Sequence, residues 1–151
     1  AVVEAAPVAA KEMPVASAKK KLSYKLQREL EALPEQIDEV EAQIAALIEE
    51  NDQVFKVHLN HYKYAERYPE QPMEFYRAEG EVFLRQLDGL LEGRDYLLAD
   101  HPSLADVALM PFVRQFAHVD REWFAQTPYV RLQAWLQRFI ESALFTSIMQ
   151  K

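Results

Sequence analysis

Two histidines have a spacing at which metal ions are bound. His58 and His61 lie three residues apart, so a helix would place both imidazoles on one face. A zinc site needs further ligands, however, and the nearby acid Glu66 is not at a supporting spacing. We therefore expect two surface histidines and no metal site.

A second group, His118, Asp120 and Glu122, combines a base with two acids. Alternate residues on a turn point in different directions, and no serine or cysteine nucleophile lies near them. We expect no catalytic residue here.

Three tyrosines, Tyr62, Tyr64 and Tyr68, are close together on one predicted helix. Aromatic side chains at helical spacing pack in a core or line an apolar small-molecule pocket, and the spacing allows both.

A serine and an aspartate introduce the stretch "HPSLADVALMPFVRQF". Ser103 is placed as an N-cap, and Asp106 lies where its carboxylate reaches back to the Ser103 amide, which completes a capping box. The residues after it are apolar on nearly all sides and predict a central, buried helix that Pro111 bends. We interpret Ser103 and Asp106 as structural residues.

A basic cluster near the start has the charge to contact phosphates. It consists of Lys19, Lys20, Lys21, Lys25 and Arg28, whereas the net charge of the chain is −7. This balance argues against nucleic-acid binding by the whole surface and leaves either a local contact or a solvated linker.

Composition excludes several classes of function. The chain of 151 residues has three glycines and no cysteine, so no phosphate-binding glycine loop, disulfide or thiolate site can be built. No apolar run reaches transmembrane length, and the first residues lack a signal-like block. We expect a soluble, cytoplasmic protein.

Three segments are predicted along the chain. Residues 1–21 have no periodicity and indicate a disordered linker. Residues 22–47 form a heptad-patterned helical arm, and Pro34 predicts a short helix before it and a longer one after it. The arm's apolar residues alternate in steps of four and three: Leu26, Leu30, Leu33, Ile37, Val40, Ile44 and Leu47.

Residues 48–151 predict a helical domain. One apolar stripe follows "MEFYRAEGEVFLRQLDGLLEG", and Gly80 on it allows a neighbouring helix to approach. Gly93 is a stop signal, and "PYVRLQAWLQRFI" carries another stripe. No segment alternates with a period of two, so the fold class is all-α.

The stretch "PSLADVALMPFVRQFAHVDREWF" resembles the C-terminal helical domain of bacterial glutathione S-transferases, in which a capping box opens the central helix. The resemblance extends from about residue 47 to residue 151 and implies a helical bundle of that type. It carries the capping-box role to Ser103 and Asp106 and makes Tyr62, Tyr64 and Phe116 a possible hydrophobic pocket for a co-substrate.

The same resemblance implies a missing half. In the family, a thioredoxin-like domain binds glutathione and supplies the catalytic residue, and no βαβ pattern precedes Leu47 here. We therefore expect a domain that is inactive alone, with no cofactor, and with glutathione bound only if a thioredoxin-like domain is supplied. Exposure of the apolar face that this domain would cover predicts a homo-oligomer or limited solubility.

The first part resembles another family. "KKKLSYKLQRELEALPEQIDEVEAQIAAL" is similar to the start of the C-terminal coiled-coil extension of F-type ATP-binding cassette proteins. That resemblance implies a fusion or a fragment. It also implies an alternative function, a nucleic-acid or ribosome-binding module that uses the basic linker and the arm.

Overall fold

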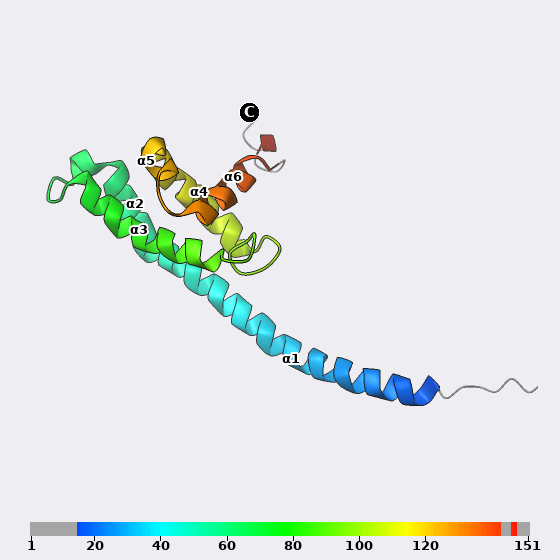
Figure 1. The fold of residues 1–151 in the computed structure, drawn as a ribbon. Helices are drawn as coiled ribbons and strands as arrows, with labels where there is room; N and C mark the ends of the chain where they lie inside the picture. The colour runs from blue at the N-terminus through cyan, green and yellow to red at the C-terminus, as the bar shows by residue number, and fades with distance from the viewer. Residues whose placement is uncertain (1–14, 143–145, 148–151) are drawn as a thin grey trace, which may run out of the picture. The chain divides into compact units, whose positions relative to one another are not determined.

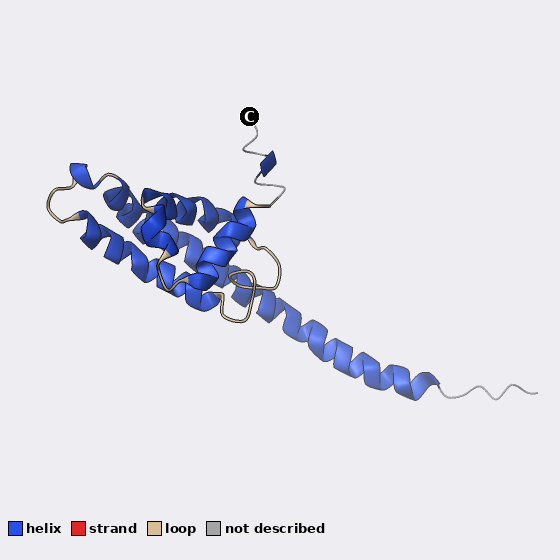
Figure 2. Ribbon diagram, turned by 45° about the horizontal axis from the view of Figure 1, so that its top comes forward, coloured by secondary structure: helices blue, strands red, loops and turns tan. Residues whose placement is uncertain are grey.

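The computed structural model describes residues 15–142, 146 and 147, with side chains from residue 23 onward. These residues form helices and loops and contain no strand, as the all-α prediction requires (Figure 2). Among the described helices, none is both long and apolar enough to cross a membrane. Along the chain the elements are α1 (Val15–Glu50), a π-helix η1 (Asn51–Phe55), α2 (Lys56–Lys63), a 3₁₀ turn η2 (Ala65–Arg67), α3 (Met73–Leu90), α4 (Leu104–Val119), α5 (Arg121–Ala125) and α6 (Val130–Ile140).

Helix α1 passes through Pro34 without interruption, so the predicted break at this residue is wrong. Proline removes one backbone hydrogen bond, the one that would reach the carbonyl of Leu30. Both residues are exposed, so water can hydrate that carbonyl. The surrounding Glu, Ala, Leu and Gln residues favour the helical conformation on both sides.

The predicted linker, residues 1–21, lies outside the described residues up to position 14. From Val15 onward it is the beginning of α1. Alanine and lysine, which dominate this part, have high helix propensity and no preference for turns. The predicted boundary at residue 47 also falls inside α1 and stays a prediction.

The chain consists of two compact units, Ala1–Glu39 and Val40–Lys151. The second unit holds the core, in which α2 packs against α3 and α4, and α6 against α3 and α4 (Figure 1). The predicted stripes of α3 and α6 face inward. The largest fully buried aromatic side chains are Phe55, Tyr62, Phe116 and Trp135.

Helix α4 is buried on one side only, which corrects the expectation of a helix surrounded by protein. Leu109 and Val113 are fully buried, whereas Leu104 is 64% and Val107 is 52% exposed. Helices α2 and α6 cover the inward side of α4 and leave these two side chains in solvent.

Gly80 on α3 makes room for the Phe116 ring of α4. A Cβ atom at this position would lie 2.4 Å from Cε2 of Phe116, so any side chain would push the ring away. Gly93, in the loop after α3, has a φ of +72°, a conformation that favours glycine. Gly80 thus accommodates a side chain of a neighbouring helix, and Gly93 lies in the loop just beyond Leu90, where α3 ends.

Candidate functional site

The Asp106 carboxylate is a buried junction between three segments. Its Oδ2 accepts hydrogen bonds from the backbone amide of Ser103 (2.8 Å) and from the Ser103 hydroxyl (3.0 Å). Its Oδ1 accepts from the amide of Leu97 (3.0 Å) and from Nε1 of Trp135 (2.9 Å). The capping box at the start of α4 is present, and the same carboxylate also holds the preceding loop and α6. Its contacts are structural.

A second buried carboxylate, Asp88 on α3, fixes the start of α6. Its Oδ1 accepts from the backbone amide of Leu132 (3.0 Å), which caps α6 from a neighbouring helix. The Arg131 guanidinium donates both to Oδ2 (3.1 Å) and to the Asp88 carbonyl (3.0 Å). Sequence reasoning missed this residue. An acid within the apolar stripe between Leu87 and Leu91 was the available signal.

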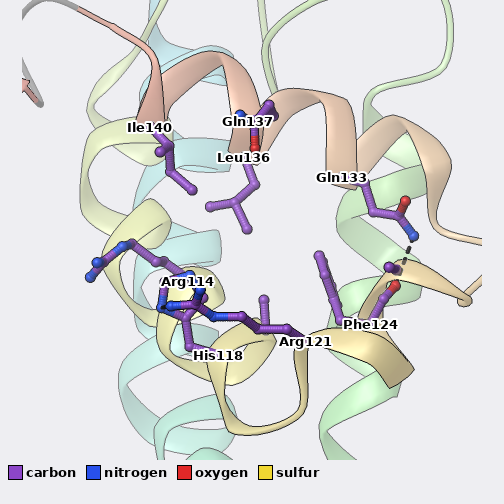
Figure 3. Close-up of a pocket in the computed structure, with 10 residues that line it drawn as sticks. Arg114, His118, Arg121, Phe124, Gln133, Leu136, Gln137 and Ile140 are labelled. Carbon is purple, nitrogen blue, oxygen red and sulfur yellow. Dashed lines mark hydrogen bonds between the residues drawn. The ribbon is translucent and has the colours of Figure 1, made fainter.

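With α4 and α6 held in this way, a pocket of about 480 Å³ opens between α4, α5 and α6. Its apolar surface comes from Ala117, Phe124, Leu136 and Ile140. Its cationic surface comes from Arg114 and Arg121, and the imidazole of His118 lies beside them in the lining. In Figure 3, Leu136 and Ile140 reach from α6 toward the side on which the two arginines and His118 lie.

The surroundings of the His118 ring favour its neutral form. Burial lowers the pKa of His118, and the charges of Arg121 and Arg114 lower it further. Nη2 of Arg121 lies 3.5 Å from Nδ1 of His118. Because a guanidinium can only donate, Nδ1 accepts in this contact, which leaves the ring proton on Nε2.

A smaller hollow of about 290 Å³ shares Arg114 and His118 with this pocket and adds Lys63. No acidic residue of the described chain lines either hollow. In a chain with a net charge of −7, this surface is a local concentration of positive charge.

Of the three residues expected to line a hydrophobic pocket, two belong to the core. Tyr62 is 1% and Phe116 0% exposed, and their ring centroids are 4.8 Å apart. Burial raises the pKa of the Tyr62 hydroxyl, an effect that the nearby Arg77 partly offsets. Tyr64 lies half-buried at the end of α2, with the Arg67 guanidinium 4.7 Å from its ring centroid. None of the three lines the pocket between α4, α5 and α6.

Of the histidines and acids considered above, His61 has a packing role and Asp120 a capping role. The ring of His61 lies 4.1 Å from that of Tyr68 and 5.0 Å from that of Tyr76, measured between centroids. Asp120 caps α5, since its Oδ1 accepts from the amide of Trp123 at 3.0 Å. Among the described residues, no cluster of three or more His, Cys, Asp or Glu side chains could hold a metal ion.

The basic cluster lies on α1. Lys25 and Arg28 are exposed, and the Arg28 guanidinium lies 5.2 Å from the ring centroid of Tyr24. Lys19, Lys20 and Lys21 belong to the same helix, and their side chains lie outside the described residues.

The two arginines of the pocket were missed from the sequence. Arg114 and His118 are separated by one helical turn and share a face of α4, which was a usable signal. Arg121 joins them only because the chain turns between α4 and α5, and the sequence pattern does not reveal that turn's geometry.

Comparison with known proteins places this helical arrangement in a family. Neither the curated proteins nor the solved structures compared with the chain gave a significant match. A family description matches residues 24–138, which include part of α1, all of the elements from η1 to α5, and most of α6. That family is the glutathione S-transferase C-terminal domain, and the chain belongs to it.

Proposed function

We propose that this chain forms one wall of a co-substrate site, in which a molecule with an apolar body rests in the pocket between α4, α5 and α6. A thioredoxin-like domain would bind glutathione and supply the reactive group. The observation that carries the proposal is the pocket, whose volume of about 480 Å³ lies within the range of small-molecule sites.

The pocket has the apolar floor and fixed walls that such a site needs. Ala117, Phe124 and Leu136 each expose less than a tenth of their surface and are packed in the core. Gln133 on α6 holds the end of α5, because its Nε2 donates to the carbonyl of Phe124 at 2.9 Å (Figure 3). The same Nε2 also donates to the carbonyl of Thr127 at 3.1 Å. The ligand would therefore meet a preformed surface and would not have to order it.

The residues of the pocket support binding and not catalysis by this chain alone. Its lining contains cationic, amide and apolar side chains, and no serine, cysteine or tyrosine among the described residues. We expect the purified chain to bind apolar compounds without conjugating them to glutathione. Measurable conjugation by the chain alone would contradict this.

Obstruction of the pocket tests the assignment. Ala125 on α5 lines the pocket and is exposed, so Ala125→Trp fills it without disturbing the core. Ala134→Trp places the same side chain at an exposed position of α6 outside the pocket lining and is the matched control. Calorimetric titration with 2-naphthamide, a neutral apolar probe, should give an affinity about tenfold lower for Ala125→Trp, equivalent to about 1.4 kcal/mol. Equal affinities for the two variants would overturn the proposal.

Self-association through α1 is a second part of the proposed function. Apolar side chains of its heptad pattern are exposed, including Leu30 at 63% and Ile37 at 54%. Burial of such a stripe against a second copy would remove apolar surface from water. Sedimentation equilibrium should detect a dimer, and the double substitution Leu30→Glu with Ile37→Glu should weaken it. A monodisperse monomer at high protein concentration would count against this contact.

Nucleic-acid binding by α1 remains the alternative function. The observation in its favour is that positions 21, 25 and 28 of this single helix follow one another at helical-turn spacing and are all basic. Anisotropy titration with a single-stranded RNA oligonucleotide at low salt should then reveal binding that weakens steeply with added salt. The pair Lys25→Gln and Arg28→Gln should abolish it, and the equally charge-reducing pair Arg67→Gln and Arg94→Gln should not. Absence of binding at low salt would remove this alternative.

A further inference from the structure

We propose that the pocket between α4, α5 and α6 selects ligands in which a carboxylate is attached to an apolar body. The inference rests on the proposed function, which makes this pocket the co-substrate site, and it names the chemical class of that co-substrate. Its basis is that cationic side chains of α4 and α5 line the same pocket as the apolar side chains that α6 contributes.

The cationic side chains come from α4 and α5, whereas two of the apolar ones, Leu136 and Ile140, come from α6. Arg114 and His118 come from the last turns of α4, and Arg121 comes from the first turn of α5. In Figure 3 the side chains of Leu136 and Ile140 approach this group from α6. A ligand with a charged end and an apolar body would satisfy both kinds of side chain, whereas a uniformly apolar ligand would leave the cations desolvated.

The positive charge of the pocket favours an anion of planar shape. The charges of the two arginines already lower the pKa of His118, which reflects the local positive potential. A guanidinium group presents parallel N–H donors that match the two oxygens of a carboxylate. The neutral His118 ring can add a hydrogen bond from Nε2, since Nδ1 faces Arg121.

The neutral amides of the pocket are engaged elsewhere. Nε2 of Gln133 donates to Phe124 and Thr127, and Nε2 of Gln137 donates to Oε1 of Glu141 at 2.7 Å. The exposed guanidinium of Arg121 is therefore the group that we expect to donate to the polar end of a ligand. A neutral polar group would gain less from it than a carboxylate, because hydrogen bonds between ionised partners are about twice as strong.

A matched pair of probes separates charge from shape. 2-Naphthoate and 2-naphthamide have nearly the same size and the same apolar rings, and they differ in the charge of one group. In calorimetric titrations of the whole chain at low salt, we expect naphthoate to bind about tenfold more tightly, which corresponds to about 1.4 kcal/mol. Added salt should weaken naphthoate binding and leave naphthamide binding nearly unchanged.

Substitution at Arg121 tests whether the preference arises in this pocket. Arg121 is exposed, so Arg121→Gln should leave the melting temperature nearly unchanged and remove the preference for naphthoate. Arg121→Lys keeps the charge without the paired donors and should retain part of the preference. Arg94→Gln, an exposed arginine in the loop after α3 that does not line this pocket, is the matched control and should behave like the unchanged chain.

A spectroscopic measurement gives a second, independent readout. Naphthoate binding should raise the pKa of His118 in proton–carbon NMR spectra, since the bound anion favours the imidazolium, and naphthamide should not. The resonance is assigned by its loss in His118→Gln.

The outcomes of these titrations test two claims separately: that the pocket is a co-substrate site, and that it prefers a carboxylate. If neither probe binds, the proposed co-substrate site is wrong. If both bind equally, the pocket remains a co-substrate wall and the carboxylate preference is overturned. A preference that survives Arg121→Gln, or that disappears with Arg94→Gln, would place the anion elsewhere and would also overturn the inference.

Discussion

The apolar stripe of α3 and that of the first half of α1 share helical spacing and have opposite surroundings. On α3, Leu84 and Leu87 are fully buried, whereas on α1 Leu30 is 63% exposed. Both segments are helical. The difference shows that an apolar stripe stabilises a fold only where another element covers it, and that α1 keeps its helix there by intrinsic propensity.

The largest expected effect on the free energy of unfolding comes from removing the buried carboxylate of α4. Removal of an exposed carboxylate on α1 is the comparison. Asp106→Ala would leave the Leu97 amide and the Trp135 Nε1–H without their acceptor and would remove the cap, which should cost about 3–5 kcal/mol. Asp38→Ala, at an exposed position of α1, should cost less than about 0.5 kcal/mol. Urea denaturation monitored by circular dichroism measures both, and comparable costs would contradict the structural role assigned to Asp106.

Leucine truncation compares the two stripes directly. Leu84→Ala opens a cavity in the core and should lower the free energy of unfolding by about 2–5 kcal/mol. Leu30→Ala should change it by less than about 0.5 kcal/mol at concentrations where the chain is monomeric. A Leu30→Ala effect that grows with protein concentration would instead measure burial of the α1 stripe against a second copy. A large effect in the monomer would show that the comparison is wrong.

Two glycines of α3 lie on different faces of the helix, Gly80 on the packed face and Gly89 on the open face. Gly80→Ala forces the buried Phe116 ring to move, at a cost of about 1–3 kcal/mol that exceeds the helix-propensity gain of up to about 1 kcal/mol. At Gly89 a Cβ atom meets nothing within 4 Å, so Gly89→Ala should stabilise the chain by up to about 1 kcal/mol. Thermal denaturation should therefore give shifts of opposite sign. Stabilisation by both substitutions would show that the Phe116 ring of α4 is less closely packed against Gly80.

The smallest expected effect is the contribution of His118 to the pH dependence of folding stability. Because its pKa is lowered on folding, the unfolded chain takes up a proton first as the pH falls below the usual histidine value of about 6.5. Stability from this group is therefore present at higher pH and decreases as the pH falls toward the lowered pKa. The charged groups that face His118 are Arg114 from α4, Arg121 from α5 and Lys63 from α2, and the polar residues that α6 adds to the described lining are uncharged glutamines.

The measurement is the melting temperature at a pH above the usual histidine pKa of about 6.5 and again at a pH below the lowered pKa of His118. His118→Gln should lose less stability than the unchanged chain when the pH is lowered through this range. An identical decrease in both proteins would show that other groups carry the pH dependence. His101→Gln, at an exposed position in the loop before α4, is the matched control.

Local patterns were the predictable part of this fold. The capping box and the buried stripes of α3 and α6 each depend on residues a few positions apart, where helix geometry fixes which side chains share a face. The break at Pro34 was a local prediction that failed, because hydration of one exposed carbonyl and good flanking helix formers compensate for a single missing hydrogen bond.

The candidate site was less predictable because its residues meet only after folding. Tyr62 and Phe116 have the same spacing whether they fill a core or line a pocket, and the structure buries both. The capping of α6 by Asp88 joins residues more than forty positions apart (Asp88 and Leu132) and has no local signature beyond an acid within an apolar stripe.

The sequence by itself determined that this chain is helical and where α3 and α6 carry their apolar faces, since both follow from short-range spacing. Its resemblance to a known family pointed to the family that the match over residues 24–138 shows. Only the tertiary structure decided that Arg114, His118 and Arg121 face Leu136 and Ile140 across one pocket. The physical reason is that the turn between α4 and α5, and the two buried carboxylates that hold α6, set the distances between side chains on different helices.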